Sequence, residues 1–423
     1  MTETSTLRLE PMPAAPDTAG SAGGIPGYAP ASGGKRDGAA PGRPAVAAPA
    51  SETTQRFEFT GSGGEYFRIW IVNLLLSIVT LGVYSAWAKV RRLQYFYRNT
   101  RIAGDIFDYH GNPKAILKGR ILALVLLVAY KLASELSMVA ALAVGVALVA
   151  IMPWLLSRAF RFKLANSSYR GLRFRFQGTV VQAYRMLILF PVILAFIGVF
   201  AWSVFASFDS RPRLGLILLA VLLLFVVLMA GVPLAHYLLK RYQHDNAWYG
   251  QSPFFFHASA GAFFKVYAKS AAVASLGGIP VAVFGFLTGD LFRYLSTTPF
   301  GWLFKILYGM ASAYASYMVL RAYLESRIQN LVWNNTELSD LGFESSARAR
   351  TLFWIHASNL ALIMLTLGLY KPFATVRLVK YRVESLALAS HADLEEFFAD
   401  QTVDEAGAVG QEAGEFFDID IAL

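Results

Sequence analysis

A twelve-residue pattern recurs along the chain, and it constrains the fold more strongly than any other feature. It reads FEFTGSGGEYFR at 57–68, FDYHGNPKAILK at 107–118, FRFQGTVVQAYR at 174–185 and FFFHASAGAFFK at 254–265. A degraded fifth copy, FESSARARTLFW, occupies 343–354. An asparagine stands eight residues before the first aromatic of copies two to five: Asn99, Asn166, Asn246 and Asn335. The chain therefore repeats one structural unit.

Each copy predicts a short extended segment that leads into a helix. Aromatic residues at alternate positions place both rings on one side of an extended chain, and the glycine that follows permits a turn. A basic residue near the helix start is typical of an anchor at headgroup level. The four anchors are Arg68, Lys118, Arg185 and Lys265. The asparagines are predicted to be structural, because an asparagine side chain can cap a helix end or close a turn.

The segments between the copies are apolar enough to cross a bilayer as helices. The chain is 56% hydrophobic and only 16% charged, with a mean hydropathy of +0.45. Apolar runs that approach or exceed the roughly 20 residues of a transmembrane helix lie in pairs between copies, at about 118–135 and 137–157, 185–208 and 214–239, and 264–287 and 300–323. The sequence thus predicts an all-α polytopic membrane protein with about eight hydrophobic spans and short interfacial extended segments.

Two shorter units bracket these three helical hairpins and are related to each other. IVNLLLSIVTLGVYSAWAKVR (71–91) aligns without gaps to ASNLALIMLTLGLYKPFATVR (357–377). The matched polar and hinge candidates are Asn73, Thr80 and Gly82 in the first half-unit and Asn359, Thr366 and Gly368 in the second. Each half-unit either crosses the membrane once or returns at the Thr-Leu-Gly break. The two asparagines either pair with each other or bond a backbone carbonyl nearby.

Composition divides the chain into three parts. Residues 1–53 are rich in Ala, Pro and Gly, which predicts a disordered tail. Residues 55–385 form the predicted membrane domain, and 386–423 form an acidic tail with ten acidic residues and no Lys or Arg from Asp393 onward. The preceding 392 residues carry a net charge of +20. The acidic tail either docks on this basic body or stays solvated.

The basic residues gather at the junctions between hairpins, which the positive-inside rule places in the cytoplasm. Anionic lipid headgroups are the expected partners of this charge, and nucleic acid is not. The absence of cysteine excludes disulfides and thiolate metal sites, and the six histidines lack metal-ligand spacing. The chain is therefore predicted to be no enzyme and to need no cofactor.

The run NLLLSIVTLGVYSAWAKVRRLQYFYRNTRIAGDIFDYHG (73–111) resembles the YjgN-like family of bacterial inner-membrane proteins, a domain of unknown function. The resemblance implies a multi-pass protein of the bacterial cytoplasmic membrane and brings no substrate. Three functions stay open. Internal repeats and paired helix breaks favour a transport or channel-like protein; the alternative is a non-catalytic scaffold for lipid or partner proteins, and a lipid-modifying enzyme has the least support. A cavity lined by both half-units would favour transport, and a solid core would favour the scaffold.

Overall fold

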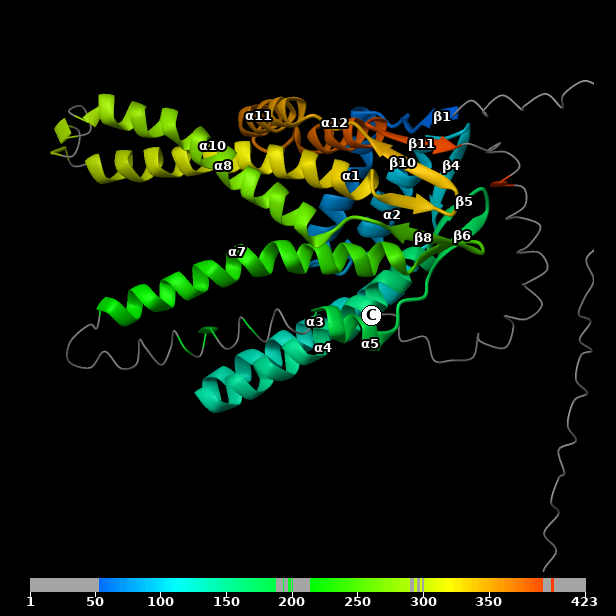
Figure 1. Cartoon of the computed structure of the whole chain (residues 1–423), viewed down its shortest axis with the longest axis horizontal. Coiled ribbons are helices and arrows are strands. Elements are labelled where there is room, and N and C mark those ends of the chain that lie inside the picture. Colours follow the sequence, from blue (N-terminus) through cyan, green and yellow to red (C-terminus); the bar gives the residue numbers. More distant parts are fainter. Residues whose placement is uncertain are drawn as a thin grey trace, which may run out of the picture. The chain divides into compact units, whose positions relative to one another are not determined.

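The computed structural model describes residues 53–187, 214–289 and 300–390, together with a few isolated positions in the gaps between these ranges and Phe397–Phe398. All of these residues belong to one of two compact units of the chain, Ala50–Leu423. Eleven short strands of this unit form one antiparallel sheet, and pairs of helices connect successive strand pairs (Figure 1). The tail predicted at 1–53 lies outside the described residues, except for Thr53.

The strands are short, and most helices are long. The strands are β1 (Thr53–Arg56), β2 (Glu58–Phe59), β3 (Thr100–Ile102), β4 (Asp105–Tyr109), β5 (Ser167–Tyr169), β6 (Leu172–Phe176), β7 (Ala247–Tyr249), β8 (Ser252–Phe256), β9 (Thr336–Leu338), β10 (Leu341–Ser345) and β11 (Leu386–Ser390). The helices are α1 (Gly63–Val79), α2 (Ser85–Arg98), α3 (Pro113–Leu136), α4 (Met138–Ala165), α5 (Val180–Leu187), α7 (Leu214–Asp245), α8 (Ala260–Leu287), α10 (Gly301–Trp333), α11 (Ala349–Leu365) and α12 (Lys371–Glu384).

Tight two-residue turns connect the strands within each β-hairpin. In β3–β4 the turn residues Ala103 and Gly104 have φ of 46° and 83°, and in β5–β6 Arg170 and Gly171 have φ of 49° and 84°. Positive φ at both central positions matches the right-handed twist of the flanking strands. These hairpins therefore form locally, immediately after each junction asparagine.

One extended stretch nearly closes the sheet into a barrel. β1 pairs with β11, opposing Thr53 to Ser390, and β2 pairs with β3, opposing Glu58 to Arg101. Only Phe57 separates β1 from β2, and its N–H donates to the carbonyl of Leu386 at 3.1 Å. The two ends of the strand order are thus one stretch of chain, which covers the edges that an open sheet would expose.

The same hydrogen bond joins each unit to the next. The N–H after the second aromatic position of each copy donates to a carbonyl at the junction of the following unit: Thr60 to Asn99 (2.9 Å), His110 to Asn166 (2.8 Å), Gln177 to Asn246 (2.9 Å), His257 to Asn335 (2.8 Å) and Ser346 to Ser385 (2.9 Å). The Nδ2 of each junction asparagine donates to the carbonyl four residues earlier, at 2.7 or 2.8 Å. Each asparagine thus ends one helix and holds the strand of the neighbouring unit.

The first aromatic of each copy faces the interior of the barrel. The rings of Phe57, Phe107, Phe174, Phe254 and Phe343 follow one another, with successive centroids 6.3, 6.5, 6.4 and 6.1 Å apart. Aromatic contacts of this kind add stability beyond the area they bury. The repeat of the sequence therefore becomes a ring of five neighbouring aromatic side chains.

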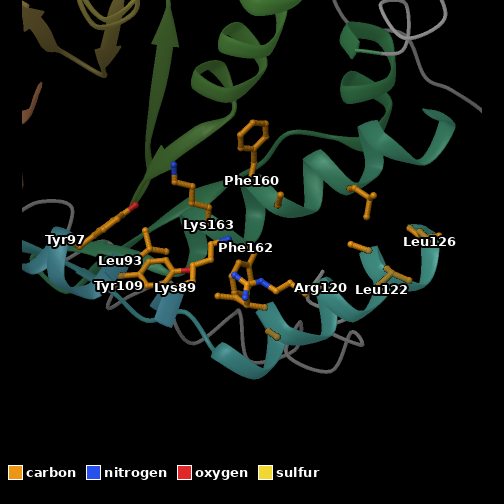
Figure 2. Close-up of a pocket in the computed structure, with 16 residues that line it drawn as sticks. Lys89, Leu93, Tyr97, Tyr109, Arg120, Leu122, Leu126, Phe160, Phe162 and Lys163 are labelled. Atoms are coloured by element: carbon orange, nitrogen blue, oxygen red, sulfur yellow. The ribbon is translucent and has the colours of Figure 1, made fainter. Parts of the chain in front are cut away.

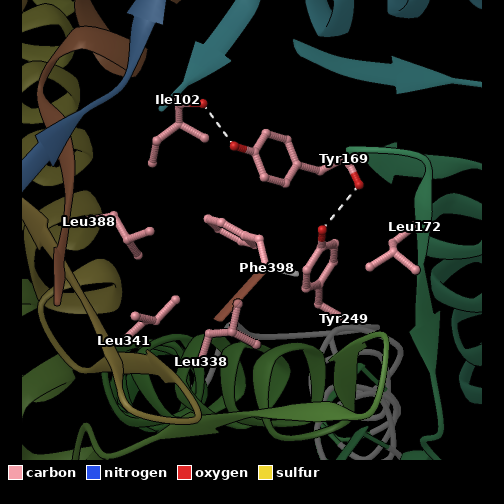
Figure 3. Close-up of a cluster of buried hydrophobic side chains, with 8 residues drawn as sticks. All are labelled: Ile102, Tyr169, Leu172, Tyr249, Leu338, Leu341, Leu388 and Phe398. Atoms are coloured by element: carbon pink, nitrogen blue, oxygen red, sulfur yellow. Dashed lines mark hydrogen bonds between the residues drawn. The ribbon is translucent and has the colours of Figure 1, made fainter. Parts of the chain in front are cut away.

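A buried cluster fills the space beside this ring (Figure 3). The hydroxyls of its two tyrosines donate hydrogen bonds to backbone carbonyls. Tyr169 Oη donates to the carbonyl of Ile102 at 2.8 Å, and Tyr249 Oη donates to the carbonyl of Tyr169 at 3.1 Å. Phe398 lies among them with 4% of its surface exposed. The core of the barrel is thus aromatic, and the segment after β11 contributes to it.

The second aromatic of copies one to three packs over the glycine that follows it. A Cβ added at Gly111 would lie 2.4 Å from the ring of Tyr109, and one at Gly178 would lie 2.5 Å from that of Phe176. Gly111 and Gly178 are not among the described glycines that have a positive φ. The close approach of the ring therefore explains these glycines better than the conformational freedom of a turn.

The prediction of an all-α protein is wrong, because the junctions form an eleven-stranded sheet. The Arom-x-Arom segments β4, β6, β8 and β10 do not pair with one another; each pairs with the three-to-five-residue strand that follows the next junction. Strands of three residues carry too little alternation to be recognised in a sequence. Each of these strands pairs on one side with the other strand of its own hairpin and on the other side with a strand more than 40 residues earlier in the chain.

The prediction of about eight spans is also wrong. Within the described residues, three helices are long and apolar enough to cross a membrane: Met138–Ala165, Val221–Asp245 and Gly301–Trp333. The half-unit helices α1 and α11 have 17 residues each, and α3 carries Lys131 and Glu135 within its apolar run. Most of the span expected at 185–208 lies outside the described residues.

Candidate functional site

The two half-units each fold into a helix, a tight turn and a returning helix. Leu81 and Gly82 have φ of 50° and 91°, and Leu367 and Gly368 have φ of 50° and 94°. The threonine of each motif fixes the turn: Thr80 Oγ1 accepts the N–H of Tyr84 at 2.9 Å and donates to the carbonyl of Leu76 at 2.7 Å. Thr366 makes the two equivalent bonds. Both half-units therefore return to the sheet from which they start.

No hydrogen bond joins Asn73 and Asn359 among the described residues. Asn359 Nδ2 donates to the carbonyl of Ala374 at 3.2 Å, which is the backbone alternative left open by the sequence. Both Asn73 and Asn359 are buried, and the Oδ1 of each has no hydrogen-bond partner among the described residues. The half-units nevertheless touch, since the rings of Phe67 on α1 and Phe373 on α12 lie 5.7 Å apart.

A cavity of about 500 Å³ lies where the half-units meet; we call it the half-unit cavity. Its wall combines α1, α2, the start of α3 and α12. It includes Asn73 and four cations: Lys89, Arg92, Arg120 and Lys371. No acidic residue lines it. A cavity with this lining attracts anions and repels cations.

A second cavity of about 540 Å³ adjoins the first between α2, α3 and α4; we call it the α3–α4 pocket. Lys89, Leu93 and Arg120 line both cavities. Figure 2 shows the side chains of Lys89 and Arg120 converging beside Phe162, whereas the ammonium of Lys163 points away at the rim. The remaining lining is almost entirely apolar or aromatic.

The cations of this region lie close enough to affect one another. Burial lowers the pKa of Lys89, and the nearby charges of Arg120, Arg92 and Lys163 lower it further. Like charges gathered in a partly desolvated place destabilise one another, and an anion placed between them would relieve the repulsion. None of the ion pairs formed by the described residues includes Lys89, Arg92 or Arg120.

The other residues singled out from the sequence lie outside both cavities. The basic anchors are exposed in the opening turns of α1, α3, α5 and α8: Arg68, Lys118, Arg185 and Lys265. The junction asparagines stand at helix ends beside the sheet. Asn73 alone of the hinge and polar candidates lines a cavity. No group of side chains within the described part of the chain could hold a metal ion.

In the sequence, three of the lining cations, Lys89, Arg92 and Arg120, belong to the positive charge of the junctions and show no other compositional signal. Their convergence could not be predicted, because α2 and α3 are brought side by side by the β3–β4 hairpin between them, and this hairpin was not predicted from the sequence. Their position could have indicated a site, because each of the three cations lies one or two turns inside a helix rather than at its end.

Comparison with known proteins identifies the family. The family described as "Bacterial protein of unknown function (DUF898)" matches residues 54–416. An inner membrane protein YjgN of Salmonella typhimurium is 24% identical over 367 residues, which cover 81% of this chain and 90% of the relative. An inner membrane protein YjgN of Escherichia coli O157:H7 is 27% identical over 145 residues, covering 33% of this chain and 35% of the relative. No solved structure matches. The YjgN-like resemblance is thereby confirmed, and the chain belongs to the DUF898 family, whose curated relatives found here are inner membrane proteins.

Proposed function

We propose that the chain is a transport or channel-like protein of the inner membrane, and that its solute passes through the half-unit cavity. One observation carries the proposal: a cavity of about 500 Å³ is lined by residues of both half-units, α1 and α2 of the first and Lys371 and Thr375 on α12 of the second. Transporters commonly place their solute site at the contact between two related repeats.

The lining indicates the sign of the solute. Lys89, Arg92, Arg120 and Lys371 contribute four positive charges, and the buried Oδ1 of Asn73 has no partner among the described residues. Positive side chains lining a pore select anions. A single amide beside them can receive a hydroxyl or bound water of the solute.

The turns of the half-units supply places where the walls of the cavity can move. Gly82 and Gly368 adopt left-handed conformations, and an added Cβ at either would meet no atom within 4 Å. Hinges of domain motion often use a few such loop residues. Rocking of one helical hairpin against the other would open and close the cavity.

The test is flux through the full chain in proteoliposomes. Vesicles are loaded with labelled succinate or with labelled choline, and the release of each is compared with release from protein-free vesicles. We expect faster succinate release, slowed in the variant Arg92→Gln/Lys371→Gln. The control Lys114→Gln/Arg173→Gln removes two exposed charges that line neither cavity and should release succinate as the parent does. Equal, background release of both solutes would contradict the proposal.

A non-catalytic scaffold is the second candidate, and the aromatic packing inside the barrel favours it, although a cavity of about 230 Å³ lies among these side chains. The ring of five phenylalanines and the buried cluster beside it form a core of aromatic and aliphatic side chains. A protein that stays folded in the vesicles but releases neither solute would support this candidate instead.

A further inference from the structure

We propose that the α3–α4 pocket binds an anionic amphiphile, with its phosphate or carboxylate head between Lys89 and Arg120 and its hydrocarbon chain along α3 and α4. The inference goes beyond the proposed function, since it concerns the neighbouring pocket, which shares Lys89 and Arg120 with the half-unit cavity. Binding itself can be tested without flux.

The head of the ligand is specified by two converging cations. Lys89 on α2 and Arg120 on α3 point toward the same place beside Phe162 (Figure 2). Arg120 also donates to the hydroxyl of Ser85, which fixes the guanidinium beside the start of α2. A guanidinium beside an ammonium is a common arrangement for binding a phosphate or carboxylate. Basic pockets between membrane helices bind anionic lipid headgroups in this way.

The hydrocarbon chain is specified by the rest of the lining. Leu122 and Leu126 on α3 face the pocket, and Leu155 closes it from α4. Figure 2 shows the two α3 leucines one helical turn apart, leading away from the cation pair along the helix. The volume of about 540 Å³ lies within the usual range of small-molecule sites. An apolar groove that begins at two cations fits a molecule with one charged end.

The surroundings place this groove at the lipid surface. α4 is one of the three helices long and apolar enough to cross a membrane. Apolar side chains on its outer face and on that of α3 are exposed, including Leu124 at 60% and Val139 at 78%. Tyr97 and Tyr109 close the opposite end of the pocket, beside the barrel. A lipid can therefore enter sideways from the bilayer, with its head kept near the junctions.

The experiment measures binding to the full chain in neutral detergent. The probes are phosphatidylglycerol, phosphatidylcholine with the same acyl chains, and inorganic phosphate, and native mass spectrometry and melting temperature are the readouts. We expect phosphatidylglycerol to bind and raise the melting temperature more than phosphatidylcholine does. Stabilisation by inorganic phosphate alone, equal to that by phosphatidylglycerol, would replace the amphiphile with a soluble anion and overturn the proposal.

Variants separate the pocket from general surface charge. Lys89→Gln/Arg120→Gln should weaken phosphatidylglycerol binding about tenfold or more, given the contribution of a basic residue near an anionic lipid. Lys114→Gln/Arg173→Gln removes the same charge elsewhere and should leave the affinity within about twofold of the parent. Equal loss in both variants would show that only net charge matters. If the first variant does not fold, Ala123→Phe fills the groove and should reduce lipid binding while Lys89 and Arg120 stay in place.

The outcomes for the two proposals can be told apart. Selective lipid binding without succinate flux would sustain the lipid site and remove the transport function. Succinate flux without selective lipid binding would sustain the transport function and remove the lipid site.

Discussion

Phe107 and Phe174 stack in the barrel with ring centroids 6.5 Å apart and planes at 12°, although a complete helical hairpin separates them in the sequence. The contact shows how the repeated units build a common core. Each unit contributes one ring to a shared core, so no unit can complete this core by itself. Repeat architectures commonly bury their apolar surface only between neighbouring units.

The ring of phenylalanines should therefore contribute much more stability than the aromatic residues that point outward. Phe254 lies between Phe174 and Phe343 in the barrel, tilted against the first ring and stacked on the second, whereas its neighbour Phe255 is 45% exposed. We expect Phe254→Ala to cost about 2–4 kcal/mol, less than a fully buried phenylalanine would because its ring is only partly buried. Phe255→Ala should change the melting temperature in detergent little. Equal effects of the two substitutions on the melting temperature would mean that the five phenylalanines do not form a stabilising core.

Each junction asparagine should stabilise the end of its helix. Asn166 Nδ2 donates to the carbonyl of Phe162 at 2.7 Å, and this bond is lost in Asn166→Ala while the backbone bond from His110 stays. We expect a loss of about 1 kcal/mol, the usual net contribution of one such bond. Thermal melting of Asn99→Ala and Asn166→Ala checks this. Unchanged melting temperatures in both variants would refute the structural role.

The turns of the half-units should depend on glycine. Gly82 and Gly368 have φ of 91° and 94°, a backbone conformation that residues with a side chain rarely adopt. Gly82→Ala should cost about 1–2 kcal/mol through backbone strain alone, because an added Cβ meets no atom. Gly64→Ala is the matched control: it also meets no atom, but it lies within α1 and should be neutral or slightly stabilising.

The ion pair between Arg98 and Asp108 should make stability depend on pH. Burial raises the pKa of Asp108, but hydrogen bonds from Arg98 and the Tyr109 N–H, with the charge of Arg98, outweigh it and leave the pKa below its usual value. A lowered carboxyl pKa stabilises the fold above the unfolded value, near about 4, and this contribution is lost as pH falls through the folded value. Asp108→Asn should thus lower stability by up to about 1 kcal/mol at neutral pH and not at pH 2. Asp340→Asn, an exposed control, should show no such difference.

Repetition along the sequence predicted a good part of this arrangement. The spacing of asparagine, paired aromatics and basic residues located the junctions up to Asn335 but not the last one, at Ser385, and the return at Thr-Leu-Gly was one of the two alternatives left open for the half-units. The strands β3, β5, β7 and β9 could not be predicted, since three residues after an asparagine carry no periodic signal. The cation pair of Lys89 and Arg120 was missed for the same reason: only the intervening β-hairpin folds α2 back beside α3.

The segment after β11 should dock through an aromatic side chain rather than through its acidic charges. Phe398 is 4% exposed, its ring lies 5.2 Å from that of Tyr169 in an edge-on arrangement, and the guanidinium of Arg170 lies 4.8 Å from its centroid. Apolar burial is insensitive to screening, whereas exposed ion pairs weaken as salt rises. We therefore expect Phe398→Ala to lower the melting temperature in detergent by the same amount at low and at high salt. Phe398→Leu should recover most of the loss, because it restores apolar volume and forfeits only the ring contacts with Tyr169 and Tyr249 and the contact with Arg170. An effect of Phe398→Ala that vanishes at high salt would show instead that charge holds the segment in place.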